Sequence, residues 1–533
     1  MTANRRIFLN IVATYGRSLY ALALGLISAR WVLTSLGTID YGLYGVIAGM
    51  TAFISFFNGL LGSSIGRFYA VNVGRTMLTG GEQTGLEECR KWFNTAISIH
   101  TVIPVILILV GYPIGVWAIR NWMTVPVERV ADSVWVFRFV CFSCFVGMLN
   151  VPFSAMYGAK QYIAELTIYS FVSTTVNFAF LCYMISHPGN WLTRYAFFTM
   201  LLAVVPQLII CIRAFQVFEE CRIKVQYLWS WARIRQLVSY AGWLFFGSTG
   251  VLLRNQGFSL LINKCFGPIL NATLTIANSV AAHTDSLSAS VNGAFSPAVM
   301  NLEGKGDRQG MIQLACMSSK VGSIVCLFFM LPLSVEIDVV LKLWLKTPPI
   351  LAAEACLMVL AILAMDQLAR GLNLAITADG RIGLYNAVIG SMHILSLPVA
   401  IIVVCIYGGG FLSVLSVLVI AKLIGIVTGA IIVKHIIDFP VRSWILDLCV
   451  PLAVVTAISV AVGIFARKCF WQLGLIHIPL SFLCVELVFV SLVWRIALNE
   501  KERQFLLCKI LTRFTLFSQC RGGNDERSKS KSN

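Results

Sequence analysis

Long apolar runs dominate this chain of 533 residues. Hydrophobic residues make up 58% of it and charged residues only 12%, which excludes an ordinary soluble globular protein. Fourteen runs approach or exceed roughly 20 residues, enough for an α-helix to cross a bilayer. The sequence therefore predicts an all-α polytopic membrane protein. The predicted spans are 9–35, 41–70, 92–119, 132–157, 161–186, 190–214, 235–262, 268–300, 313–335, 351–378, 382–406, 409–434, 445–466 and 475–498.

The distribution of Lys and Arg predicts the orientation of these spans. With the N-terminus in the cytoplasm, 26 of the 41 basic residues fall on the cytoplasmic side and 8 on the other side. Cytoplasmic loops retain positive charge, so this asymmetry predicts that both termini are cytoplasmic and that the protein lies in the cell (inner) membrane. After the last span, residues 501–517 alternate charged and apolar groups, which is typical of an amphipathic helix at the membrane surface.

The formal net charge of +17 does not indicate a nucleic-acid partner, because the basic residues lie in short links rather than on a soluble face. The 16 cysteines lie almost entirely within apolar runs, where we expect them to pack. Cys141 and Cys144 have no second pair or histidine nearby that would complete a metal site. We therefore expect no nucleic acid, metal or cofactor.

An internal repeat emerges when the chain is compared with itself at an offset of 230 positions. Gly37 then aligns with Gly267, and Gly74 with Gly304. Six spans separate the copies, so both have the same orientation, and an axis along the membrane normal would relate them. This predicts two six-helix lobes facing a central cavity. The predicted domains are an N-terminal lobe at 1–230, a C-terminal lobe at 231–437, an appended helix pair at 438–498 and a cytoplasmic tail at 499–533.

Several cations lie inside the predicted spans, where each costs at least about 2.5–3.5 kcal/mol near the bilayer centre. A chain that carries so many must use them, and the obvious use is to hold an anion. Arg17 and Arg254 lie farthest from the helix ends, so they are the leading substrate-binding candidates; Arg30 and Arg67 lie nearer the ends and are weaker ones. The seven cations are Arg17, Arg30, Arg67, Arg138, Arg254, Arg370 and Lys422.

The second predicted lobe also carries polar groups. Asp366 and Arg370 stand four residues apart on one helix face, a spacing that predicts an ion pair. Asp366 could instead act with Lys422 as a coupling element. The span 268–300 is too polar to face lipid, so we expect Asn292 to contact substrate and Asp285 to contribute to coupling.

Two stretches resemble a known family. Residues 30–44, RWVLTSLGTIDYGLY, look like the opening signature of O-antigen type polysaccharide-biosynthesis flippases, and residues 266–272, FGPILNA, look like their seventh-to-eighth helix segment. These transporters belong to the multidrug, oligosaccharidyl-lipid and polysaccharide exporter superfamily. The resemblance implies a two-lobed bundle that moves undecaprenyl-pyrophosphate-linked oligosaccharides to the outer leaflet by alternating access. It also implies membrane lipids, a polysaccharide polymerase and glycosyltransferases as partners. Related flippases carry cavity arginines on helices 1, 2 and 8, whereas this chain has none in helix 8.

Two alternatives remain open. A cation-coupled multidrug exporter of the same superfamily would need an uncompensated carboxylate in the first lobe, but residues 1–39 contain no Asp or Glu. A membrane enzyme such as a glycan polymerase or ligase would be expected to carry a sizeable external loop or an intramembrane catalytic His with a partner acid, and neither appears in a convincing arrangement. We therefore expect a transporter of an anionic cargo rather than an enzyme.

Overall fold

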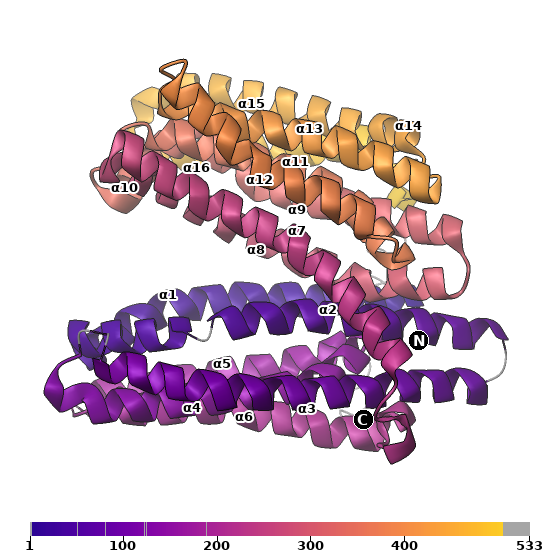
Figure 1. Cartoon of the computed structure of the whole chain (residues 1–533). Coiled ribbons are helices and arrows are strands. Elements are labelled where there is room, and N and C mark those ends of the chain that lie inside the picture. Colours follow the sequence, from indigo (N-terminus) through magenta and orange to yellow (C-terminus); the bar gives the residue numbers. More distant parts are fainter. Residues whose placement is uncertain are drawn as a thin grey trace, which may run out of the picture. The chain divides into compact units, whose positions relative to one another are not determined.

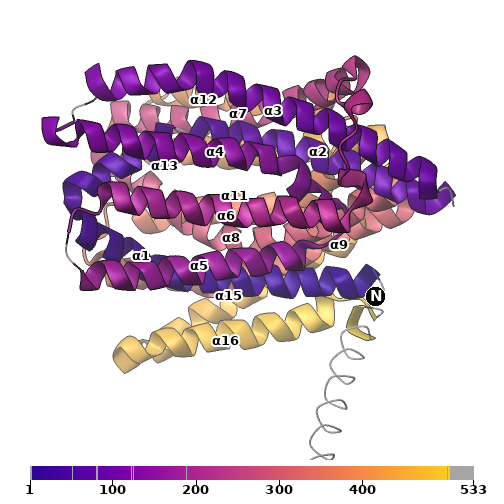
Figure 2. The same cartoon turned by 90° about the horizontal axis from the view of Figure 1, so that it is seen from below.

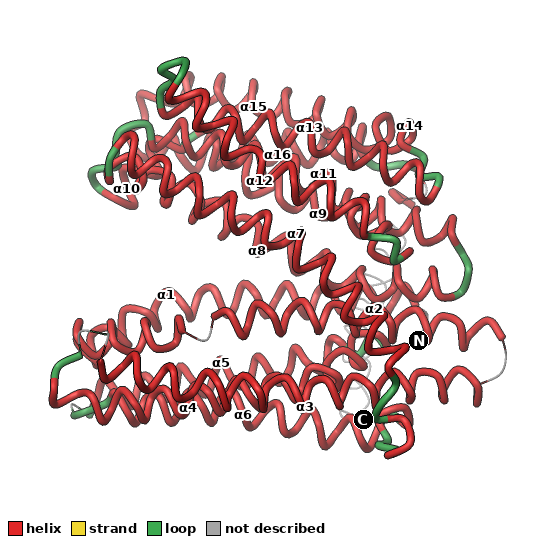
Figure 3. The backbone as a smooth tube through the Cα atoms, in the orientation of Figure 1, coloured by secondary structure: helices red, strands yellow, loops and turns green. Residues whose placement is uncertain are grey.

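The computed structural model describes residues 3–50, 52–79, 82–121, 123, 125–187, 189–500 and 502–504. Within these ranges the chain is built from helices joined by loops, without a strand (Figures 1 and 3). Short 3-10 or π segments lie at 127–129, 219–221, 225–227, 445–449, 471–476 and 493–497. The helices are α1 (Ala3–Met50), α2 (Ala52–Thr79), α3 (Glu82–Asn121), α4 (Val130–Ala159), α5 (Ile163–Ser186), α6 (Leu192–Val217), α7 (Trp231–Phe266), α8 (Pro268–Gly304), α9 (Arg308–Val335), α10 (Ile337–Leu345), α11 (Ala352–Asp379), α12 (Gly383–Cys405), α13 (Phe411–Ile437), α14 (Val441–Trp444), α15 (Val450–Phe470) and α16 (His477–Leu492).

The helices have the dimensions of membrane spans. In the described part of the chain, ten helical stretches are long and apolar enough to cross a membrane, and the last of these, Val441–Ala497, contains both α15 and α16. Each of the fourteen predicted spans overlaps a helix; the second, 41–70, falls on the end of α1 and most of α2. The prediction of an all-α polytopic membrane protein is thus confirmed. The predicted tail at 499–533 lies almost wholly outside the described residues.

The two aligned glycines of the repeat have the same backbone conformation. Gly37 interrupts α1 with φ 76° and ψ 168°. Gly267 separates α7 from α8 with φ 85° and ψ 175°. This region of φ/ψ space is essentially restricted to glycine, because a Cβ atom would clash with the backbone. The same sharp break therefore recurs 230 positions along the chain.

The second pair of aligned glycines forms a reciprocal contact between α2 and α8. A Cβ atom placed on Gly74 would lie 2.9 Å from the Cα of Gly304 and would overlap the Asn301 carbonyl oxygen. A Cβ atom on Gly304 would lie 2.9 Å from the Cα of Val71 and would overlap its carbonyl oxygen. Val71 and Asn301 are themselves 230 positions apart, so each helix presents equivalent residues to the other. Such reciprocity is the mark of a local twofold relation.

The chain divides into two compact units, one made of Met1–Ser323 and Pro349–Phe439 and the other of Ile324–Pro348 and Pro440–Asn533. Both predicted lobes fall almost entirely in the first unit, and the division into lobes stays a prediction. Within that unit α4, α6 and α5 run side by side (Figure 2). Ile47 of α1, Ile119 of α3 and Phe137 of α4 form one of its buried apolar cores.

The second unit contains a buried carboxylate. Glu336 is fully buried, and its carboxylate lies 3.4 Å from the Arg467 guanidinium and 3.4 Å from His477 Nε2. The Ser481 hydroxyl donates to it at 2.7 Å. Arg467 also donates to the carboxylate of Asp338 at 2.9 and 2.6 Å. Burial alone raises the pKa of Asp338, but the hydrogen bonds and charge of Arg467 outweigh it and hold that pKa below its ordinary value.

Replacing Arg467 with Met should destabilise this unit by about 3 kcal/mol, because Glu336 would keep its burial and lose its nearest permanent cation. The measurement is the Tm of the purified protein in detergent, with Arg442→Met, an exposed arginine of the same unit, as the control. Folding lowers the pKa of Asp338, so the ionised carboxylate stabilises the folded protein above about pH 4. This stabilisation is lost as the pH falls further. Equal Tm values for both variants would contradict the claim that Arg467 stabilises the buried carboxylate of Glu336.

Candidate functional site

Arg254, in the second half of α7, hydrogen-bonds only to neutral groups among the described residues. Its Nε and Nη2 atoms both donate to Asn255 Oδ1 at 3.1 Å. Its Nη1 atom lies 3.3 Å from Nδ1 of His393 on α12, so that nitrogen must be unprotonated to accept the bond. The guanidinium therefore lies within a span and forms no ion pair with a described carboxylate, although the charge of Asp366 acts on it from farther away. Its donors remain available to an anion.

The carboxylates of this region pair with other cations. Asp366 of α11 bonds to Lys422 of α13, and Arg370 of α11 bonds to Asp285 of α8. The predicted pair of Asp366 with Arg370 is therefore wrong: the two share a helix face, but each finds a closer partner on a neighbouring helix. The alternative that joined Asp366 to Lys422 has the observed contact. Within each pair the carboxylate neutralises its cation, whereas Arg254 makes no ion pair with a described residue.

Asn292 belongs to a polar network between α8, α9 and α11. Gln367, almost fully buried, donates to Asp285 Oδ1 at 2.7 Å. Asn292 lies between Gln367, at 3.4 Å, and Ser318, whose hydroxyl donates to it at 3.0 Å. The substrate-binding role expected for Asn292 stays a prediction, since its amide is engaged within the protein. In the ranges that the structure describes, no group of three or more His, Cys, Asp or Glu side chains could hold a metal ion.

Among the described residues, Arg17 in the first half of α1 has one hydrogen bond, which Nη1 donates to the hydroxyl of Ser170 on α5 at 3.4 Å. One turn along, the hydroxyls of Tyr20 and Thr175 lie 3.0 Å apart, so α1 and α5 present a polar seam to each other. Like Arg254, Arg17 has no carboxylate partner among the described residues. The side chain of Arg30 lies outside the described residues.

Arg67 of α2 caps the C-terminal end of α11. Its guanidinium donates to the carbonyl oxygens of Thr377 at 2.8 Å, Ala378 at 3.1 and 3.2 Å, and Asp379 at 2.7 Å. These carbonyls lack partners within their own helix, and the helix dipole favours a cation there. Gly380, with φ 95°, makes the approach possible, because a Cβ atom would overlap the guanidinium. The predicted role of Arg67 in substrate binding stays a prediction, since its donors are used by backbone.

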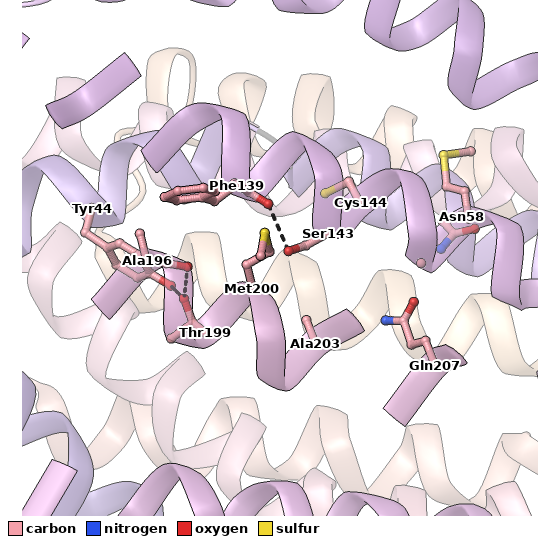
Figure 4. A pocket seen from close by; sticks show the side chains of 13 residues that line it. Tyr44, Asn58, Phe139, Ser143, Cys144, Ala196, Thr199, Met200, Ala203 and Gln207 are labelled. Carbon is pink, nitrogen blue, oxygen red and sulfur yellow. Dashed lines mark hydrogen bonds between the residues drawn. The ribbon is translucent and has the colours of Figure 1, made fainter. Parts of the chain in front are cut away.

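A cavity of about 330 Å³, mostly apolar but with several polar side chains in its lining, lies among α1, α2, α4 and α6 (Figure 4). Tyr44 donates to the Thr199 hydroxyl at 3.3 Å on one wall. The Oδ1 atom of Asn58 and the Oε1 atom of Gln207 are buried and accept no hydrogen bond from the described residues. Buried acceptors without a donor are costly, so they invite a ligand that brings hydroxyl or amine groups. The sequence signal for this cavity is the presence of two amides, Asn58 and Gln207, within apolar helices. Neither residue was among the predicted site residues.

No protein-family profile and no curated protein matches the chain, but solved structures resemble it closely in fold. A MATE protein in its bent conformation superimposes with a TM-score of 0.65 at 14% identity, over 83% of this chain and 96% of the other. The outward-facing structure of a multidrug resistance MATE family transporter of the MOP superfamily gives 0.63 at 12% identity, over 81% and 95%. The chain has the MATE fold.

A third structure with the MATE fold is a MOP superfamily transporter from Pyrococcus furiosus, with a TM-score of 0.62 at 13% identity over 80% of this chain and 95% of the other. Its description reports a binding pocket of reverse polarity and suggests a different function for that protein. Such a likeness shows the fold alone. The charge of a substrate of this chain must therefore be argued from the charges of its own site residues.

Proposed function

We propose that the protein is an alternating-access transporter that flips an anionic lipid-linked oligosaccharide, of the undecaprenyl-pyrophosphate type, from the inner to the outer leaflet. The observation that carries the proposal is the pair Arg17 and Arg254, two guanidiniums within spans that hydrogen-bond only to neutral groups and form no ion pair among the described residues. Arginine suits a pyrophosphate, because its planar fork donates paired hydrogen bonds and stays charged at every physiological pH. Arg30, Arg67 and Asn292 are proposed as further substrate contacts.

The proposed cellular setting follows from the predicted orientation. Both termini would lie in the cytoplasm of a cell with an inner membrane, glycosyltransferases would supply the lipid-linked glycan, and a polysaccharide polymerase would receive it. In that orientation the Gly74–Gly304 contact and the Arg67 cap lie at the cytoplasmic ends of their helices. These contacts support an inward-closed state as one end point of the transport cycle.

The coupling of transport to an ion gradient is assigned to the paired charges of the second predicted lobe. Lys422 and His393 line one small cavity with Tyr385, and Lys422 bonds to Asp366. A cation or proton that neutralised Asp366 would free Lys422, while Asp285 and Arg370 form a second such pair. The proposal is therefore that these two pairs link the conformational change to an ion gradient.

A cation-coupled multidrug exporter is the second candidate, favoured by the fold shared with a multidrug resistance transporter. Purified protein in proteoliposomes distinguishes the two. Movement of a labelled lipid-pyrophosphate oligosaccharide to the opposite leaflet supports the flippase, whereas export of a cationic dye without any lipid flipping supports the multidrug exporter. Imposed proton, sodium and voltage gradients, applied one at a time, identify the coupling ion.

The cavity of Figure 4 would receive sugar hydroxyls, which can donate to the two unpaired amide oxygens. Gln207→Leu keeps the approximate size of the side chain and removes its acceptor, so the flipping rate at subsaturating substrate should fall about tenfold. Met200→Leu, on the same wall of the cavity, is the control and should leave the rate unchanged. Equal rates for the two variants would remove this cavity from the glycan path.

A further inference from the structure

A second, strongly basic cavity of about 500 Å³ lies beside the start of α7 and the start of α12. Three arginines line it, Arg67, Arg235 and Arg381, together with the exposed hydroxyl of Ser239. Its other lining residues are Phe68, Gln236, Tyr240, Trp243, Gly380, Ile382 and Gly383. The lining contains no carboxylate, so the cavity has a local excess of positive charge.

The three guanidiniums differ in how far they are engaged. Arg381 donates to the Asp379 carboxylate at 2.8 and 3.0 Å and to the Ile436 carbonyl at 2.7 Å, so it is held in place. Arg67 is held by backbone carbonyl oxygens, which carry no net charge. Arg235 is exposed and has no partner among the described residues. The first turn of α12 adds backbone N–H groups that lack an acceptor within their own helix.

An apolar track leads away from this basic cavity. Trp243, which lines the cavity, is 41% exposed, and its ring packs edge-on against Phe246 on the next turn of α7 at 6.5 Å. Phe246 is 37% exposed, and Leu384 of α12 is 55% exposed. Trp243 lies about two turns inside the predicted span 235–262, a depth at which exposed apolar side chains face acyl chains just below the headgroups. The surface therefore combines a basic cavity with exposed apolar side chains.

We propose that this cavity binds the phosphate headgroup of an anionic phospholipid, with an acyl chain lying along Trp243 and Phe246. Basic pockets between helices on the cytoplasmic side are typical sites for such headgroups. The recognised chemistry is a phosphate with net negative charge, which a free phosphate ion shares and a zwitterionic lipid lacks. The cavity lies apart from Arg17, Arg254 and the cavity of Figure 4. It shares Arg67 with the proposed substrate contacts, so the variants that test it leave Arg67 in place.

The experiment measures phosphatidylglycerol binding to the full-length purified protein by native mass spectrometry. Wild type should retain phosphatidylglycerol in preference to phosphatidylcholine. Arg235→Gln should weaken the binding about tenfold, the loss of one charge-assisted contact. Ser239→Glu, which adds a carboxylate to an exposed position in the lining, should weaken it at least as much. Arg222→Gln removes an exposed arginine from a loop outside the cavity and should change the affinity less than about twofold.

Two results would overturn the proposal. Unchanged phosphatidylglycerol affinity in both Arg235→Gln and Ser239→Glu would show that this cavity does not hold the headgroup. Displacement of phosphatidylglycerol by inorganic phosphate at equal concentration would show that a free anion, without an acyl chain, is the ligand. Retention of the wild-type preference in Arg222→Gln, with its loss in the two cavity variants, supports the assignment.

Discussion

Replacing Arg254 with Gln should reduce flipping of a lipid-pyrophosphate oligosaccharide roughly a hundredfold while the protein still inserts into the membrane. The guanidinium now spends its hydrogen bonds on Asn255 and His393, both neutral, and a bound pyrophosphate would replace these partners with charge-assisted bonds. Gln can donate but carries no charge. A loss of about 3 kcal/mol lowers the rate at subsaturating substrate roughly a hundredfold. Arg17→Gln should have a comparable effect, because Arg17 also lacks a carboxylate partner in the described structure.

Arg138→Gln provides the matched control. Arg138 also lies in a predicted span, but its Nε atom donates to the Tyr112 hydroxyl at 2.8 Å and its guanidinium lies 4.6 Å from the centre of the Trp135 ring. Both Arg138 and Trp135 are exposed, as expected of an anchor at the membrane border. Flipping rates are measured in proteoliposomes at matched protein content. Wild-type rates in both Arg17→Gln and Arg254→Gln would refute the assignment of these arginines.

The helices were predictable from the sequence because lipid tolerates few polar groups, so spans appear as apolar runs. The repeat was also predictable from the sequence, because its glycines align. Gly37 and Gly267 share a backbone conformation that other residues rarely adopt, and Gly74 and Gly304 leave room for two backbones to meet. Steric requirements of this kind act at one residue, so a comparison of the chain with itself detects them.

The partners of the charged groups were less predictable. Asp366 and Arg370 have the spacing of a pair on one helix, yet Asp285 captures Arg370 from a helix 85 residues earlier in the chain. No local pattern reports such a contact, because it depends on how three helices pack. Arg67 shows the same limit in another form: its acceptors are the carbonyl oxygens of Thr377 to Asp379, and every residue carries a carbonyl. To predict the partners of Arg67, one would need to know which helix end lies beside it, and side-chain types do not report this.

The closed contact between α2 and α8 yields the second prediction of large effect. Gly304→Ala places a methyl group against the backbone of Val71, where no side chain can turn away. The two helix ends must separate, at a cost of roughly 1–3 kcal/mol for the conformation in which they touch. We expect the flipping rate to fall about tenfold or more, because a cycle that needs this end to close would lose that state.

Gly293→Ala is the control on the same helix, since a Cβ atom at Gly293 meets nothing within 4 Å and alanine favours a helix. Its flipping rate and Tm should equal or exceed those of wild type. The reciprocal geometry adds a stricter requirement. Gly74→Ala should match Gly304→Ala, and the double variant should cost little more than either alone, because one methyl group already separates the helices. Additive losses in the double variant would mean that the two glycines act at independent sites, which the contact between them does not allow.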